Sequence, residues 1–283
     1  MIDCNAVRFL LGCRRSGVNF SSCITLGSQE LSFSEAGLAE ASQLSRNEKV
    51  PVPDLKTSRD LFTFLGAETF NEMDFSDYEG ADVLHDLNSP VGDQLSEKYS
   101  VVYDGGSLEH IFNISEALRS SMRMVKLGGH LIMQNPSNNW FGHGFYQLSP
   151  EFYFRALAEE NGFQIVRIVI HDNTGLWYEI KDPNEVRQRT ELIGVDRLFT
   201  LVCARRIAIK PIFESWPAQS DYSDLWNKGD RRIESRNIFR KLVARMKQHT
   251  PPAFLRFVRR HFGYFYRAYS LSNKKIFTKV KDF

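Results

Sequence analysis

The chain has 283 residues, of which 42% are hydrophobic and 25% are charged. These proportions are ordinary for a folded globular protein, and no apolar run approaches the ~20 residues needed to span a bilayer. The formal net charge of +2 conceals an asymmetry, because residues 231–283 carry fifteen Lys and Arg against two acids, a net +13 that leaves −11 on the rest. We therefore expect an acidic folded body followed by a basic C-terminal segment.

The cysteine pattern and the N-terminal residues bear on the cellular compartment in which the protein works. The four cysteines are Cys4, Cys13, Cys23 and Cys203. They include no CxxC pair and no dense spacing, which disfavours a zinc site and a disulfide framework and favours buried reduced thiols. Asp3 and Arg8 interrupt the apolar start of the chain, so it does not have the pattern of a secretory signal. We predict a cytoplasmic protein.

The N-terminal third predicts helices around one short strand. In residues 4–15 the apolar side chains recur at helical spacing. Residues 22–26 are a short apolar run typical of a buried strand, and residues 27–30, Gly-Ser-Gln-Glu, form the turn after it. Two further helices are predicted at residues 34–44 and 58–65.

Three acids stand directly after predicted strands. The strands end at Met73, His85 and Tyr103, and the acids are Asp74, Asp86 and Asp104. Chance could place one acid there, but three in register with a sheet are harder to dismiss. If the strands are parallel, their carboxyl ends meet at one edge, which is where ligands bind in open parallel sheets.

Residues 99–135 predict a strand, a helix and a second strand. The first strand is broken by Gly105-Gly106, the helix has Ser115 as its expected N-cap and Gly128-Gly129 as its stop, and the second strand covers residues 130–135. Such a crossover implies parallel pairing. The loops that follow the two strands then lie at the ligand-binding edge.

The rest of the chain predicts a helix, two strands and a basic tail. A helix begins at Ser149-Pro150, and strands follow at residues 163–170 and 197–205, with a mixed insertion at residues 176–193 between them. Residues 236–283 repeat apolar side chains at helical spacing among Lys and Arg. We expect them to form basic helices.

The ordered set of motifs resembles a known family. An acid-ended strand, GGSLEHI, a helix, LGGHLIMQNP and an aromatic loop leading into SPEFY resemble the second half of a class I S-adenosylmethionine-dependent methyltransferase. With its flanks, the resemblance covers residues 21–206. It implies an α/β fold: a doubly wound, seven-stranded, mostly parallel Rossmann-like sheet whose final strand is antiparallel to the others. Residues 1–210 would form this domain, and residues 211–283 an aromatic linker and a basic helical extension.

The resemblance also implies cofactor-binding residues. Gly27 and Ser28 would approach the methionine part of S-adenosylmethionine, although Ser28, Gln29 and Glu30 replace later glycines of the family turn. Asp74 would hold the ribose hydroxyls, because a carboxylate accepts two hydrogen bonds at once. An acid after the next strand would face the adenine.

That acid is Asp86, assisted by the backbone at Leu87, and Asp104 completes the implied cofactor-binding set. Each assignment has an alternative. The turn at residues 27–30 is also read as a plain strand-to-helix turn, and Asp74 as a solvated loop acid. Asp86 in Asp-Leu-Asn-Ser suits capping of its own turn equally well.

Methyl transfer to a hydroxyl needs positioning and a base. His143, in FGHGFYQ, is the leading candidate base because the glycines beside it leave the imidazole accessible; the alternative is an ordinary loop histidine. His110 is expected to pack beside the cofactor. Glu109 and Tyr146 are weaker candidate bases. The sequence shows no metal-ligand spacing.

The predicted function is methyl transfer from S-adenosylmethionine to a small-molecule or saccharide hydroxyl. The segment SWPAQSDYSDLWN resembles bacterial methyltransferases that accompany surface-polysaccharide biosynthesis. The main alternative is a non-catalytic binding scaffold. Nucleic-acid binding is disfavoured by the acidic body. We expect the basic residues 236–283 to bind an anionic membrane surface, which would make the protein membrane-peripheral, or to bind an acidic patch on a partner protein. The alternative is that they cover the acidic body of the protein itself.

Overall fold

The computed structural model describes residues 1–33, 55–172, 176–194, 196–222, 251 and 270–280. The chain divides into two compact units. The first comprises Met1–Ile180, Asp196–Pro217 and Lys279–Phe283, and the second Lys181–Val195 and Ala218–Thr278. The predicted helix at residues 34–44 and most of the basic segment lie outside the described residues. The domain boundary at residue 210 stays a prediction.

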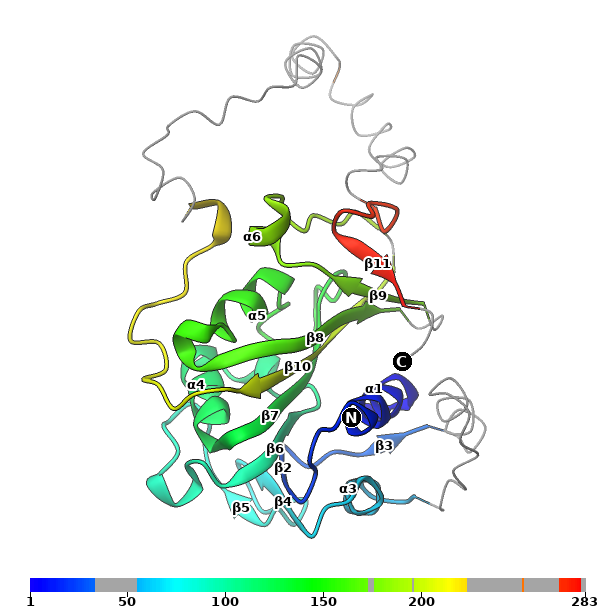
Figure 1. Cartoon of the computed structure of the whole chain (residues 1–283). Coiled ribbons are helices and arrows are strands. Elements are labelled where there is room, and N and C mark those ends of the chain that lie inside the picture. The colour runs from blue at the N-terminus through cyan, green and yellow to red at the C-terminus, as the bar shows by residue number, and fades with distance from the viewer. Residues whose placement is uncertain (34–54, 173–175, 195, 223–250, 252–269, 281–283) are drawn as a thin grey trace. The chain divides into compact units, whose positions relative to one another are not determined.

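All described strands except β1 and β3 form one large mixed sheet (Figure 1). Its strand order is β11-β9-β8-β10-β7-β6-β2-β4-β5. In chain order the strands are β2 (Ser22–Leu26), β4 (Thr69–Asp74), β5 (Val83–Leu84), β6 (Tyr99–Asp104), β7 (Val125–Pro136), β8 (Phe163–His171), β9 (Trp177–Ile180), β10 (Phe199–Arg206) and β11 (Phe277–Lys279). A separate two-stranded sheet pairs β1 (Ile2–Asp3) with β3 (Leu31–Ser32).

The sheet has nine strands of mixed orientation, so the predicted seven-stranded, mostly parallel sheet is wrong in count and proportion. All seven predicted strands are present, and β9 and β11 extend the edge beyond β8. β9 comes from the mixed insertion and is only four residues long, too short to give a recognisable period. β11 lies where basic helices were expected, so part of that expectation is also wrong.

The orientation of the strands sets up a ligand-binding edge. β2 pairs in parallel with β4 and β6, and β6 pairs in parallel with β7. β10 is antiparallel to both β7 and β8, as the family resemblance implied for the final strand. After β2 the chain adds β4 and β5 on one side of β2 in the sheet, and then adds β6 on its other side. This reversal is a topological switch point, where open α/β sheets bind ligands outside the carboxyl ends of their strands.

Helices cover both faces of the sheet. α1 (Cys4–Arg15) and α3 (Ser58–Leu65) lie on one face, and α4 (Ile114–Met124) and α5 (Pro150–Ala156) lie on the other (Figure 1). Between α3 and the sheet, the ring of Phe62 stacks on Phe70 at 5.0 Å and contacts Tyr103. All six residues of β6 are buried, as expected for a strand covered on both faces.

Two predicted helix boundaries are wrong. α4 begins at Ile114 with Asn113 at the N-cap position, so Ser115 is not the cap. The same helix ends at Met124 and passes directly into β7, so Gly128-Gly129 lie inside the strand and do not stop the helix. The β-branched Val125 and the backbone pairing of Tyr99 with it favour the earlier start of the strand.

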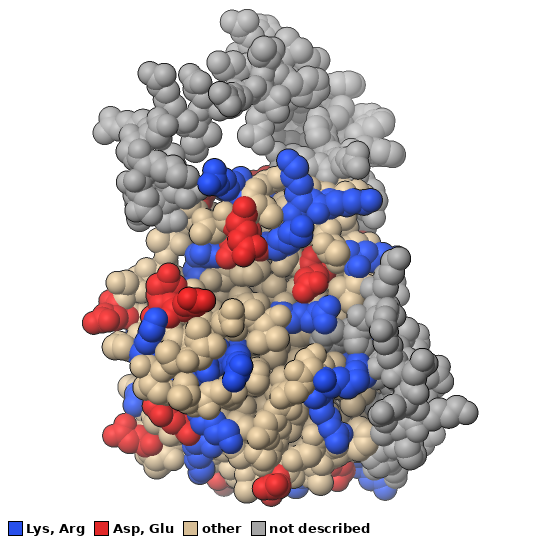
Figure 2. All heavy atoms as spheres, in the orientation of Figure 1, with Lys and Arg blue, Asp and Glu red and all other residues tan. Residues whose placement is uncertain are grey.

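The described surface bears on the partner predictions only in part. On the face drawn in Figure 2, basic and acidic side chains are interspersed over the described residues. Among the described residues, no helix combines the length and the apolar character needed to cross a bilayer. The predicted contact of residues 236–283 with a membrane or an acidic patch concerns mostly residues outside the described part.

Candidate active site

The switch point lies between the ends of β2 and β6, where Leu26 pairs with Asp104. Gly27 adopts φ +73°, and a Cβ there would stand 2.7 Å from the hydroxyl oxygen of Ser107. That hydroxyl donates to the carbonyl of Leu26 at 2.6 Å. The turn therefore requires glycine at this position both for its backbone conformation and for the approach of Ser107.

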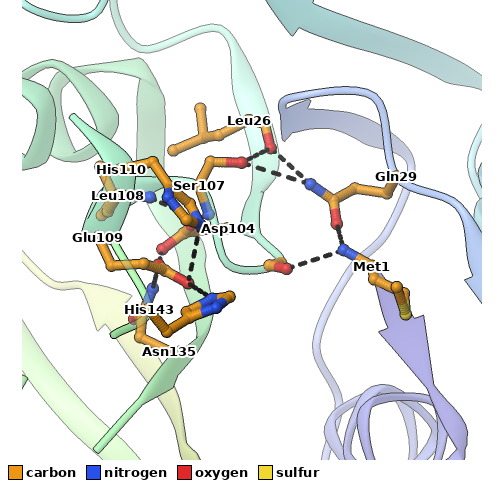
Figure 3. A network of polar contacts seen from close by, with 11 residues as sticks. Met1, Leu26, Gln29, Asp104, Ser107, Leu108, Glu109, His110, Asn135 and His143 are labelled. Carbon is orange, nitrogen blue, oxygen red and sulfur yellow. Dashed lines mark hydrogen bonds and ion pairs between the residues drawn. The ribbon is translucent and has the colours of Figure 1, made fainter. Parts of the chain in front are cut away.

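Gln29 fills the space beside this turn (Figure 3). Its side-chain amide nitrogen donates to the carbonyl of Leu26 at 2.8 Å, and its amide oxygen accepts from the α-amino group of Met1 at 2.6 Å. A Cβ on Gly105 would come within 2.3 Å of that oxygen. Gln29 thus stands over the backbone that the family resemblance assigns to the methionine part of the cofactor.

Asp74 lies half-buried at the end of β4, facing the turn after β2. One carboxylate oxygen accepts from the backbone of Phe75 at 2.6 Å, and the other accepts from the backbone of Ser28 at a longer 3.3 Å. The hydroxyl of Ser28 is buried and has no hydrogen-bond partner among the described residues. Asp74 and Ser28 therefore come together and keep hydrogen-bonding capacity at the switch point.

Asp86 is bonded within its own turn. Its carboxylate accepts from the backbone and the side-chain amide of Asn88 at 2.9 and 2.8 Å, and these bonds lower the pKa of the carboxyl. This is the arrangement of the capping interpretation. The neighbouring Leu87 is buried. The role of both residues toward a cofactor stays a prediction.

Asp104 is fully buried and holds the turn that follows β6. Its carboxylate accepts from the backbone of Ser107 at 2.8 Å and of Leu108 at 3.3 Å, and from the side chain of Asn135 at 2.6 Å. Burial raises the pKa of this carboxyl, and the hydrogen bonds oppose that rise. In this structure the carboxylate organises its own loop. Its assignment as a cofactor ligand stays a prediction.

A second buried carboxylate, Glu109, shares the same amide. The nitrogen of Asn135 reaches Glu109 Oε2 at 3.0 Å, and the oxygen of Asn135 accepts from the hydroxyl of Tyr153 at 2.9 Å. Burial and then the charge of Asp104 raise the pKa of Glu109 to about 8. The sequence indicated Glu109 only as a weaker base candidate, because nothing in a local pattern shows that a residue after Gly-Gly is buried.

Two histidines face the other oxygen of Glu109 (Figure 3). Nε2 of His143 lies 3.6 Å from Glu109 Oε1, and Nε2 of His110 lies 4.0 Å from it. The two imidazole rings meet edge to face at 4.9 Å, and Trp140 contacts His143 at 5.1 Å. Burial, and then the charge of His143, lower the pKa of His110.

The glycine-flanked loop places His143 by docking on the backbone of Glu109. The carbonyl of Glu109 accepts from the backbone of Phe145 at 2.8 Å and of Tyr146 at 3.3 Å. Gly144 has φ +68°, and a Cβ there would lie 2.8 Å from the same carbonyl oxygen. Only glycine permits that approach. The hydroxyl of Tyr146 is engaged elsewhere, donating to the carbonyl of Phe112 at 2.7 Å.

The result is a cluster of Glu109, His110 and His143, whose ligating atoms all lie within 4.8 Å of one another. The sequence named each of these residues, but two of them belong to one turn and the third to a distant loop, so no ligand spacing could be read. The local signal was the pair of glycines around His143. The structure brings Glu109 and His143, two of the candidate bases, together with His110.

Comparisons with known proteins give remote likenesses. No family model matches the chain, and no curated protein matches it. A candidate methyltransferase from Bacillus halodurans C-125 is 10% identical with a TM-score of 0.43, covering 71% of this chain and 99% of its own. An S-adenosylmethionine-dependent methyltransferase from Mesorhizobium loti is 14% identical, with a TM-score of 0.33 and coverage of 69% and 96%.

A third solved structure, the trans-methyltransferase CalH in complex with SAH, is 15% identical with a TM-score of 0.37, covering 72% of this chain and 57% of its own. These likenesses are too remote to assign the chain to a family. What the site can do therefore rests on its own geometry.

Proposed function

We propose that this chain transfers a methyl group from S-adenosylmethionine to a hydroxyl of a small molecule or saccharide. The observation that carries the proposal is one sheet edge with two adjoining parts. A glycine turn with the half-buried carboxylate of Asp74 lies at the switch point, and the cluster of Glu109, His110 and His143 follows the neighbouring strands. The first part suits a nucleoside, and the second suits proton transfer.

The residues at the switch point fit most of the cofactor. Asp74 offers a carboxylate oxygen to ribose hydroxyls, and the buried hydroxyl of Ser28 has hydrogen-bonding capacity to spare. Gly27 permits close backbone approach, and Asp86 with Leu87 would border the adenine. Gln29 would cover the methionine end, so its side chain would have to rotate away on binding. The bound cofactor would supply an electrophilic methyl group in line with the acceptor oxygen.

The cluster would receive the acceptor's proton at Nε2 of His143. The imidazolium that results would favour the ionised form of Glu109, 3.6 Å away, which would stabilise it in turn, and Trp140 would hold the ring in place. A positioned general base contributes about 10²–10⁴-fold to such a reaction. The acceptor would bind over the exposed Phe112 and Phe145, whose rings pack edge to face at 5.5 Å and offer apolar surfaces to a sugar ring.

One observation favours the non-catalytic alternative. The buried Gln29 side chain holds the backbone carbonyl of Leu26 and the amine of Met1. A binding scaffold would keep this arrangement permanently. In a methyltransferase, the bound cofactor would displace the side chain of Gln29 from these hydrogen bonds.

Titration of S-adenosylhomocysteine into the purified chain, followed by calorimetry, tests the proposal. A hydrogen-bonded carboxylate contributes roughly 1.5–3 kcal/mol, so Asp74→Ala is expected to weaken binding about 10- to 100-fold. Asp77→Ala, an exposed acid in the same loop, serves as the matched control and should bind like wild type. His143→Ala should also keep its affinity, because the base acts on the acceptor. Equal affinity of Asp74→Ala and wild type would refute the assignment.

A further inference from the structure

We propose that Glu109, His110 and His143 bind a divalent first-row transition-metal ion. Two imidazoles and one carboxylate are a ligand set that zinc and neighbouring metals accept, with further positions left for solvent or substrate. Metal binding would need neither cofactor nor acceptor. The inference therefore goes beyond methyl transfer and stands or falls independently of it.

The distances suit a cation after small side-chain movements. Metal–ligand bonds of about 2.0–2.2 Å place ligand atoms roughly 3–3.5 Å apart. Glu109 Oε1 already lies 3.6 Å from Nε2 of His143 and 4.0 Å from Nε2 of His110, and all three ligating atoms fall within 4.8 Å. The imidazole side chains are 50% and 41% exposed, so they have room to close on an ion.

A hydrogen bond orients the Glu109 carboxylate for metal binding. Asn135 donates to Oε2 of Glu109, while Oε1 is the oxygen that faces both histidines. Asn135 is itself held by the hydroxyl of Tyr153. Metal-binding carboxylates are typically oriented in this way by hydrogen bonds to the atom that does not ligate.

Electrostatics also favour a cation here. Glu109 and Asp104 are two buried carboxylates that share one neutral amide. The side chains that face Oε1 of Glu109 are the two histidines, which are charged only if protonated. A divalent ion bound at Oε1 would displace any proton that Glu109 holds and pair with the carboxylate, whose burial in ionised form is otherwise costly.

The backbone fixes where the third ligand stands. His110 and Glu109 lie in the short helix Leu108–His110, and the loop with His143 docks on the carbonyl of Glu109 through Gly144. A metal in this position would bind a hydroxyl oxygen and lower its pKa. It would also occupy Nε2 of His143, so in a metal-loaded site the proton of the bound hydroxyl would leave to solvent and not to this residue.

Calorimetric titration of Zn²⁺ into the full-length chain, after chelator treatment and dialysis, tests the site. Because the thiol of Cys4 is not fully buried and would compete for Zn²⁺, the experiment uses a Cys4→Ser background. We expect one equivalent bound with micromolar or tighter affinity. His143→Ala and His110→Ala should each weaken Zn²⁺ binding at least about 100-fold. Even mutation of residues that only hydrogen-bond to metal ligands typically lowers metal affinity 10–100-fold. His85→Ala, outside the cluster, should bind as the parent does.

A glycine pair provides a test that leaves every ligand in place. At Gly144 a Cβ would clash with the carbonyl of Glu109, whereas at Gly142 it would meet nothing within 4 Å. Gly144→Ala should therefore displace His143 and weaken Zn²⁺ at least tenfold, and Gly142→Ala should leave the affinity unchanged. Circular dichroism of each variant confirms that it is folded. Absence of saturable binding in the parent, or parental affinity in a folded His110→Ala/His143→Ala double variant, would overturn the proposal.

Discussion

The two halves of the carboxyl edge of the sheet use glycine in opposite ways. After β2 and β6, the space left open by Gly27 and Gly105 is taken by the side chains of Ser107 and Gln29. After β7, Gly144 lets a loop pack against the backbone of Glu109 and carries His143 to the surface beside it. The first half is closed by its own polar side chains, and the second presents reactive groups to solvent.

This difference shows that a missing side chain creates a site only if nothing else fills its place. The turn after β2 has one glycine followed by Ser28 and Gln29, and the amide of Gln29 folds back over it. The loop after β7 has glycine on both sides of its histidine, and its neighbours Phe141 and Phe145 remain exposed. Access to the edge is therefore decided by residues next to the glycines.

The largest expected effect separates a fully buried carboxylate of this edge, Asp104, from a half-buried one, Asp86. Asp104→Ala removes the acceptor of the Ser107 and Leu108 amides in a largely buried turn, and leaves Asn135 with Glu109 as its remaining acceptor. We expect the free energy of unfolding in urea to fall by about 3–5 kcal/mol. Asp86→Ala, which removes a carboxylate whose bonds among the described residues go to Asn88 of its own turn, is the control and should change stability little. Equal losses would erase the distinction between the two acids.

Sequence periodicity was sufficient for the strands that carry the edge. Apolar runs ending in Asp74 and Asp104 located β4 and β6, and the antiparallel final strand followed from the family resemblance. β9 was missed because four residues do not establish a period. The start of β7 was misplaced because Gly128-Gly129 resemble a helix stop although they pair within a strand.

The site was harder to predict because it depends on side-chain direction. Sequence position put Asp74, Asp86 and Asp104 in one class. In the structure Asp104 points into its own turn, Asp86 caps Asn88, and Asp74 faces Ser28. Nor could a local pattern bring His143 to Glu109, because the contact depends on a loop folding back onto a backbone carbonyl.

A smaller effect concerns pH and the body of the sheet, away from either half of the edge. His130 in β7 is buried opposite Arg205, and burial first and then that charge lower its pKa to about 4. The unfolded chain therefore binds a proton that the folded chain resists, so stability falls as the pH drops from about 6.5 to 4. We expect wild type to lose on the order of 2–3 kcal/mol more than His130→Asn over this range.

Urea unfolding of both proteins at pH 7 and pH 4 measures that difference. A parallel loss of stability in wild type and His130→Asn would assign the acid sensitivity to other groups, including the carboxylates of the edge. A loss of stability confined to wild type would assign the acid sensitivity to His130 in the body of the sheet and not to the carboxylates of the edge.

The smallest effect tests whether the closed half can open. Gln29→Ala removes the amide that covers Gly105, so the cofactor no longer has to displace its hydrogen bonds. At roughly 0.5–1.5 kcal/mol for each bond, S-adenosylhomocysteine should bind about tenfold more tightly in calorimetry. The exposed Gln94, changed to alanine, is the matched control. Unchanged affinity in Gln29→Ala would mean that this side chain does not limit access.

Hydrogen–deuterium exchange with and without saturating S-adenosylmethionine tests most directly whether the switch point binds the cofactor. Backbone amides that a ligand covers exchange more slowly because local opening becomes rarer. We predict slower exchange in residues 26–30 and 104–108, which form the two turns at the ends of β2 and β6, and no change in residues 163–171 of β8. Unchanged exchange in both turns at millimolar cofactor would contradict the account.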